Sequence, residues 1–117
     1  MEDKSLYDYL AERHPNIDFH LSESKKLERP SILSKVVVDK KERNEGAGTK
    51  FMEDLISEAD RRKHKLALTP SSDFGGQVPR LHRFYQRFGF VPNKGKHKDF
   101  SISEAMYRNP VEKLQND

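Results

Sequence analysis

The spacing of hydrophobic residues along the chain switches between the period of a strand and that of a helix. Residues 17–21 alternate apolar and polar side chains, as a strand does. Residues 32–38 end in three consecutive valines, which predicts a strand buried on both faces. Apolar residues then recur every three or four positions over residues 49–63, and this predicts an amphipathic helix. Residues 65–69 are expected to form the next strand. The order strand, helix, strand predicts a βαβ unit with parallel strands.

Weaker patterns on both sides of this unit predict two more helices and two short strands. Residues 4–13 carry apolar side chains along one side of a short helix. A second helix is expected to begin at Pro79, a residue favoured at the first helical position, and to end at Gly89, which suits a left-handed cap. Short strands are expected at residues 90–91 and 100–102, one on each side of a basic loop.

Length and composition fit one folded domain. We expect a single mixed α/β domain over residues 1–117, with a core over about 17–108 and a twisted mixed sheet flanked by helices. Charged residues make up 35% of the chain and hydrophobic ones 33%. Because the hydrophobic residues are clustered and periodic, we expect a folded core rather than general disorder.

Several functional classes are excluded or disfavoured by composition. The absence of cysteine excludes disulfides, thiolate metal sites and cysteine nucleophiles. The five histidines are scattered, so no metal site is expected. No apolar stretch has the length of a membrane span or the position of a signal peptide, and we expect a cytoplasmic protein without membrane attachment. A net charge of +3 is mild for a nucleic-acid binder, so such a function is not favoured.

The loop between the valine strand and the following helix carries the strongest chemical signal. It contains Arg43 and two glycines spaced one apart, Gly46 and Gly48. Such a loop directs backbone N–H groups into one concavity at the positive end of a helix, where phosphate groups bind. The loop lacks the third glycine of G-x-G-x-x-G and the Gly-Lys-Ser/Thr order of a Walker A loop. On the loop alone, a plain turn in which glycine supplies only conformational freedom is the alternative.

Two motifs in this order resemble the GNAT N-acetyltransferase superfamily. The valine strand followed by R-x-x-G-x-G and a helix is similar to that family's acetyl-CoA loop, and residues 81–90 resemble its helix ending in F-Y-x-x-x-G-F. Residues 106–108 also resemble the family's final strand. The resemblance extends over about residues 32–107, and the chain is also similar to short GNAT-like proteins encoded by bacteriophages. It implies the GNAT-like acyl-CoA N-acyltransferase fold with an abbreviated N-terminal part.

This resemblance implies acetyl-CoA as cosubstrate and a primary amine, on a small molecule or a protein, as acceptor. A backbone N–H near the end of the valine strand would polarise the thioester carbonyl, and the amine would attack it directly. Tyr85 would protonate the departing thiolate, although it could simply belong to the apolar stripe of its helix. The Thr49 hydroxyl would add a donor to the pyrophosphate site. The implied cosubstrate contacts are Val36, Val37 and Val38 for the pantetheine arm, and Arg43, Asn44, Glu45, Gly46, Ala47, Gly48 and Thr49 for the pyrophosphate.

Other parts of the function stay open on the sequence. No residue stands out as general base; the candidates are His20, Glu42, Glu45, Asp73 and His82. The part before residue 32 is shorter than in the family, so the acceptor cleft is expected to be open to a large acceptor or completed by a partner subunit, as in a homodimer. Two alternatives remain: a catalytically inactive GNAT-like module that binds proteins, and a small nucleic-acid binder.

The nucleic-acid alternative depends on the basic loop at residues 93–98. This loop is short and lacks interleaved aromatic residues, so we interpret it as a solvated hairpin loop.

Overall fold

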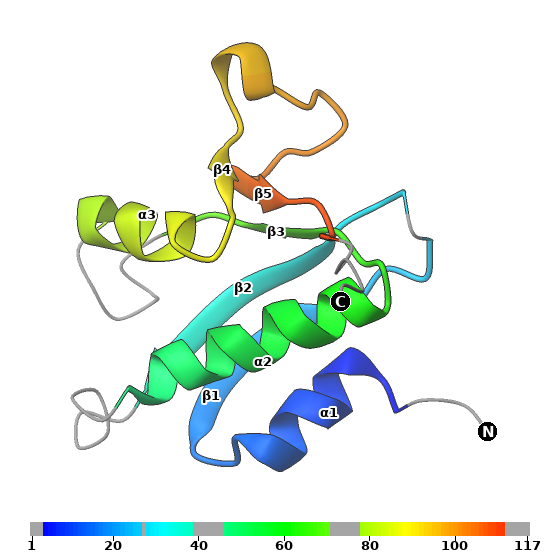
Figure 1. The fold of residues 1–117 in the computed structure, drawn as a ribbon, viewed down its shortest axis with the longest axis vertical. Helices are drawn as coiled ribbons and strands as arrows, with labels where there is room; N and C mark the ends of the chain where they lie inside the picture. Colours follow the sequence, from blue (N-terminus) through cyan, green and yellow to red (C-terminus); the bar gives the residue numbers. More distant parts are fainter. Residues whose placement is uncertain (1–3, 27, 39–45, 71–77, 112–117) are drawn as a thin grey trace, which may run out of the picture.

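The chain folds into a five-stranded mixed sheet packed against helices, as the computed structural model shows (Figure 1). The structure describes residues 4–26, 28–38, 46–70 and 78–111. The α/β class expected from the sequence is confirmed. In chain order the elements are α1 (Leu6–Arg13), β1 (Ile17–Ser22), β2 (Ser31–Val38), α2 (Ala47–Arg61), β3 (Leu66–Leu68), α3 (Val78–Gln86), β4 (Val91–Pro92), the 3₁₀ helix η3 (Gly95–His97) and β5 (Met106–Arg108).

The strands lie in the order β1-β2-β3-β5-β4. β2 and β3 are parallel and are joined through α2, which confirms the predicted βαβ unit. The other neighbouring strands pair antiparallel. In Figure 1, α1 and α2 lie together across β1 and β2, whereas α3 lies apart from them near β4. The sheet therefore has one region covered by two helices and another bordered by α3.

The core lies between α2, α1 and the sheet. The apolar face of α2 buries Phe51, Met52, Leu55 and Ala59, the spacing expected of an amphipathic helix. The ring of Phe51 packs against that of Phe19 on β1, with the ring centroids 4.9 Å apart. This packing fixes the position of α2 against β1 and β2.

β2 contains a β-bulge that the sequence did not reveal. The register with β1 shifts so that His20 faces Lys35 while Leu21 faces Leu33, which leaves Ser34 as the extra residue. The prediction that this strand is buried on both faces is wrong, because Ser34 is exposed and burial moves from Leu33 to Val36 across the bulge. A bulge bends its strand and increases its twist. The second half of β2 is therefore redirected relative to the first.

The predicted strand at residues 100–102 is wrong. The Asp99 carboxylate accepts hydrogen bonds from the backbone N–H and the hydroxyl of Ser101, which closes a turn there. The last strand is β5 instead, at the position that the family resemblance implied. Within the β4–β5 loop, the Asn93 amide donates to the carbonyl oxygens of Ile102 (2.9 Å) and Glu104 (3.0 Å), and this bridges the two sides of the loop.

A buried ion pair joins α2 to β5, and its arginine also bonds the chain between α3 and β4. The Arg108 guanidinium donates to both carboxylate oxygens of Asp60, at 2.6 and 2.9 Å, and to the carbonyl of Phe88 at 2.7 Å. Gly89 adopts φ +94° directly after this carbonyl, which confirms the predicted left-handed conformation. The prediction that the helix reaches Gly89 is wrong, because α3 ends at Gln86. A Cβ on Gly89 would come within 3.0 Å of the Arg108 side chain, so glycine is required there for conformation and for space.

Candidate functional site

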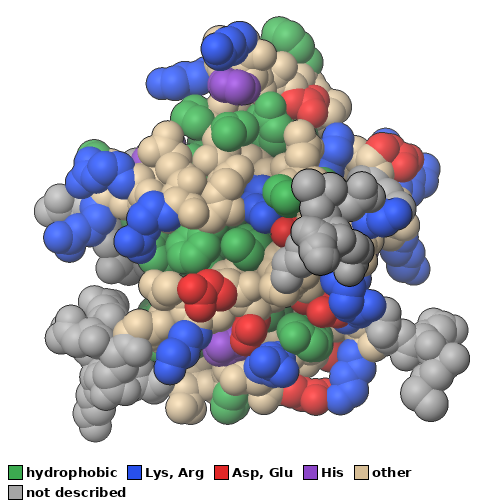
Figure 2. Space-filling view, in the orientation of Figure 1, with side chains coloured by type: hydrophobic (Ala, Val, Ile, Leu, Met, Phe, Trp, Pro, Cys, Tyr) green, Lys and Arg blue, Asp and Glu red, His purple; other side chains and the backbone are tan. Residues whose placement is uncertain are grey.

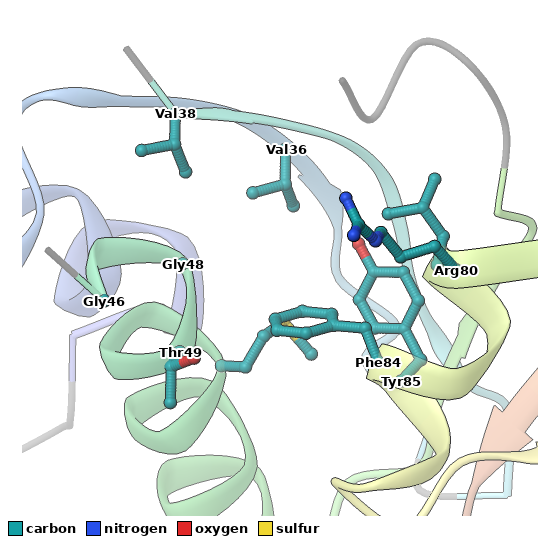
Figure 3. Close-up of a pocket in the computed structure, with 10 residues that line it drawn as sticks. Val36, Val38, Gly46, Gly48, Thr49, Arg80, Phe84 and Tyr85 are labelled. Carbon is teal, nitrogen blue, oxygen red and sulfur yellow. The ribbon is translucent and has the colours of Figure 1, made fainter. Parts of the chain in front are cut away.

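A mostly apolar cavity of about 220 Å³ lies between β2, the first turn of α2 and one side of α3 (Figure 3). This is smaller than the roughly 300–1,000 Å³ of pockets that enclose drug-sized ligands, so a long ligand would extend beyond it. Its lining residues are Val36, Val38, Gly46, Gly48, Thr49, Met52, Arg80, Leu81, Phe84 and Tyr85.

The cavity lies where β2 diverges from β3. The two strands pair only over Ser31–Leu33 of β2, although β2 continues to Val38. Within the described residues, β2 and β3 do not pair beyond Leu33. Figure 3 shows Val36 and Val38 on one side of the cavity, with Phe84 and Tyr85 of α3 across from Val36. A ligand arm entering here would run beside the backbone of β2, as an added strand would.

The N-terminus of α2 faces the same cavity. Gly46 is the N-cap with φ 77°, and no side chain caps the helix. The first turn carries no acidic residue. The positive end of the helix dipole and the first backbone N–H groups of α2 can therefore interact with an anion. Gly48 lies opposite Val38, where a Cβ would come within 3.7 Å of the valine side chain. The missing side chain thus leaves the space between helix and strand open.

The two glycines are expected to respond in opposite ways to substitution by alanine. At Gly46 a side chain would meet no atom within 4 Å, but its positive φ would cost about 1 kcal/mol in an L residue. At Gly48 alanine meets only ordinary contact and favours the helix, by up to about 1 kcal/mol. Denaturant unfolding should therefore show that Gly46→Ala loses stability and that Gly48→Ala keeps or gains it. Equal losses would contradict these conformations.

Tyr85 brings a phenolic hydroxyl to the cavity. Only 2% of its surface is exposed, and its ring packs edge-on against Phe84 and Phe90 at centroid distances of 5.2 and 6.0 Å. Burial raises the pKa of Tyr85 well above its usual value, because the apolar surroundings disfavour the charged phenolate. The side chain therefore stays protonated at neutral pH and can donate a proton or a hydrogen bond.

The structure brings together most of the residues for which the sequence implied a role. Val36, Val38, Gly46, Gly48, Thr49 and Tyr85 line one cavity. The side chains of Val37 and Ala47 do not line it, although both belong to the elements that do. Arg43, Asn44 and Glu45 lie outside the described residues.

Sequence reasoning did not assign four other lining residues to the site: Met52, Arg80, Leu81 and Phe84. The helical period could have revealed three of them. Met52 lies three residues after Thr49, Leu81 lies four residues before Tyr85, and Phe84 lies three residues after Leu81.

Neither of the two described candidates for a general base lines the cavity. His20 is exposed on β1 and His82 is half-buried on α3. Glu42, Glu45 and Asp73 lie outside the described residues. Within the described ranges, no group of three or more His, Cys, Asp or Glu residues is placed to hold a metal ion.

The comparison with protein families decides which family the chain belongs to. A family model described as an acetyltransferase (GNAT) domain matches residues 15–92, which span β1 to β4 and include the whole cavity. The chain is a GNAT acetyltransferase-family protein. Comparison of this GNAT chain with curated proteins and with solved structures gives no match. In the described part of the GNAT domain, no helix is long and apolar enough to cross a membrane.

Proposed function

We propose that this protein is an N-acetyltransferase that moves an acetyl group from acetyl-CoA to a primary amine. The observation that carries the proposal is one cavity in which three features meet: the half of β2 that lies beyond its pairing with β3, the uncapped N-terminus of α2 and the hydroxyl of Tyr85. Membership of the GNAT family supports acyl transfer in general.

Each element of the cavity would have a separate task. N–H groups at the start of α2, together with the Thr49 hydroxyl, would bind the pyrophosphate of CoA. The apolar side chains of Val36 and Val38 would contact the pantetheine arm. A backbone N–H near Val38 would donate to the thioester carbonyl and stabilise the negative charge that develops on its oxygen.

In the reaction, the amine nitrogen forms a bond to the acetyl carbon and the carbon–sulfur bond breaks. The electron pair of that bond goes to sulfur, and the Tyr85 hydroxyl supplies the proton that turns the thiolate into free CoA. The attacking nitrogen loses a proton to water, because no side chain among the described lining residues is a general base. The phenolate of Tyr85 then regains a proton from solvent, which its raised pKa favours.

Calorimetry followed by a thiol-release assay tests this proposal. We expect acetyl-CoA and CoA to bind, and thiol to be released when an amine from a panel of peptides, lysine derivatives, polyamines and small amines is added. Gly48→Ala should weaken acetyl-CoA binding about tenfold, a loss of about 1.4 kcal/mol, because its methyl group enters the space beside Val38. Ser57→Ala, an equally small change on the exposed side of α2, should leave binding unchanged.

Two outcomes would overturn the proposal in different ways. Absence of CoA binding would remove the assigned role of the cavity. Binding without transfer to any amine of the panel would contradict catalysis and support the alternative of a GNAT-like module that binds other proteins.

A further inference from the structure

Positive charge is concentrated in one segment of this nearly neutral chain. Residues 80–98 contain six of the 22 Lys and Arg residues and none of the 19 Asp and Glu residues. The net charge of the whole chain is only +3, so the remaining residues are net negative. The segment runs from the first turn of α3 through β4 into the β4–β5 loop, and its charges lie before and after β4.

Positive charges follow one side of α3 and the turn after it. Arg80 and Arg83 on α3 and Arg87 just beyond its end are all exposed, and Arg83 follows Arg80 by about one helical turn, about 4.5 Å along the axis. The backbone N–H of Arg87 donates to the carbonyl of Arg83 at 3.3 Å, which keeps Arg87 close to the end of the helix. The guanidinium of Arg87 also lies 5.3 Å from the ring centre of Phe84. None of the three forms an ion pair with a carboxylate of the described residues.

The β4–β5 loop, which the Asn93 hydrogen bonds bridge, carries a second group of positive charges. Lys94, Lys96 and Lys98 are exposed and, within the described ranges, make no salt bridge. The Tyr107 hydroxyl donates to the carbonyl of His97, which holds the loop against β5. In Figure 2 a cluster of Lys and His side chains covers this loop at the top of the molecule, and another basic cluster lies over α3 at the left of the same face.

An exposed aromatic ring accompanies these lysines. Phe100 is 90% exposed, and the Lys98 ammonium lies 5.7 Å from its ring centre. An aromatic side chain therefore lies beside the basic loop in the folded chain. A phenyl ring open to solvent next to cations offers a surface on which a base can stack.

We propose that α3 and the β4–β5 loop together form a binding surface for single-stranded nucleic acid, here called the basic ridge. It consists of Arg83, Arg87, Lys94, Lys96, Lys98 and Phe100, and Arg80 lies where it meets the cavity. Guanidinium groups pair with phosphate in a planar, bidentate manner, and lysines add charge along the strand. An acidic peptide would satisfy the cations but would leave Phe100 without a base. The proposal does not depend on acetyl transfer.

Fluorescence anisotropy with a labelled 20-nucleotide single strand tests the basic ridge. We expect binding that weakens steeply with salt, by about 0.7 in log K per log unit of salt for each phosphate contact. The triple variant Lys94→Gln, Lys96→Gln, Lys98→Gln should bind at least about tenfold more weakly, with a slope shallower by about 2. Phe100→Ala should bind about fivefold more weakly or worse, with an unchanged slope, because it removes stacking and no charge.

A matched variant separates the ridge from total charge. Lys25→Gln, Lys26→Gln, Lys63→Gln removes three exposed lysines elsewhere on the chain and should bind like the unmodified protein. The proposal is overturned if no single strand binds at low salt or if the two triple variants bind alike. It is also overturned if Phe100→Ala has no effect, or if polyglutamate or a duplex of equal length binds as tightly. Because the assay contains no acetyl-CoA, these outcomes are independent of the proposed acetyl transfer.

Discussion

Replacing Tyr85 with phenylalanine is expected to lower kcat for acetyl transfer about 100-fold. General acids contribute about 10²–10⁴ to a rate, and the lower end applies here because a thiol, with a pKa near 8.5, leaves more readily than an alcohol. Phenylalanine keeps the ring that packs against Phe84 and Phe90, so the fold and acetyl-CoA binding should be preserved. Steady-state kinetics on the amine found in the panel would measure the loss.

The pH dependence of this variant distinguishes proton donation from packing. Burial raises the pKa of Tyr85 above its usual value, so the hydroxyl of the unmodified protein stays protonated from about pH 6 to 9, and its ionisation should not limit the rate there. The two proteins should therefore differ by a large factor throughout that range. Tyr107→Phe is the matched control, because its hydroxyl bonds the His97 carbonyl outside the cavity. Unchanged turnover of Tyr85→Phe across the range would show that Tyr85 only packs.

The elements with strong periodicity were predictable from the sequence, because their burial follows a single face. The long helix from Ala47 to Arg61 and the parallel pairing of β2 and β3 follow from such patterns. Predictions failed where a side chain replaced backbone pairing. The strand expected at residues 100–102 is a turn because Asp99 bonds Ser101, and a polar side chain of this kind carries no periodic signal.

The site was predictable only as far as local motifs reach. The glycines at the start of α2 and the position of Tyr85 could be inferred because each belongs to a short motif. The bulge at Ser34 could not, because it depends on the register with β1, which only the folded sheet defines. Arg80 enters the site for a similar reason, since its place at the cavity depends on how α3 packs against β2.

Replacing Arg108 with methionine is expected to destabilise the domain by about 3–5 kcal/mol. The ion pair with Asp60 is almost fully buried, with 6% and 10% of the two side chains exposed, and removing one partner leaves an uncompensated charge in the interior. The same change also removes the hydrogen bond to the Phe88 carbonyl. Denaturant unfolding of the variant would measure the loss.

Two comparisons show whether burial is the cause. Lys35→Met breaks the exposed ion pair with Asp18 and should cost far less, because solvent screens that pair. The double variant Arg108→Met, Asp60→Leu should recover part of the loss, since it removes both charges rather than stranding one. If Arg108→Met is no less stable than Lys35→Met, burial of the ion pair is not the cause of the loss. Since Arg108 holds the chain at Phe88, three residues after Tyr85, Arg108→Met should also lower acetyl transfer by displacing that hydroxyl from the cavity.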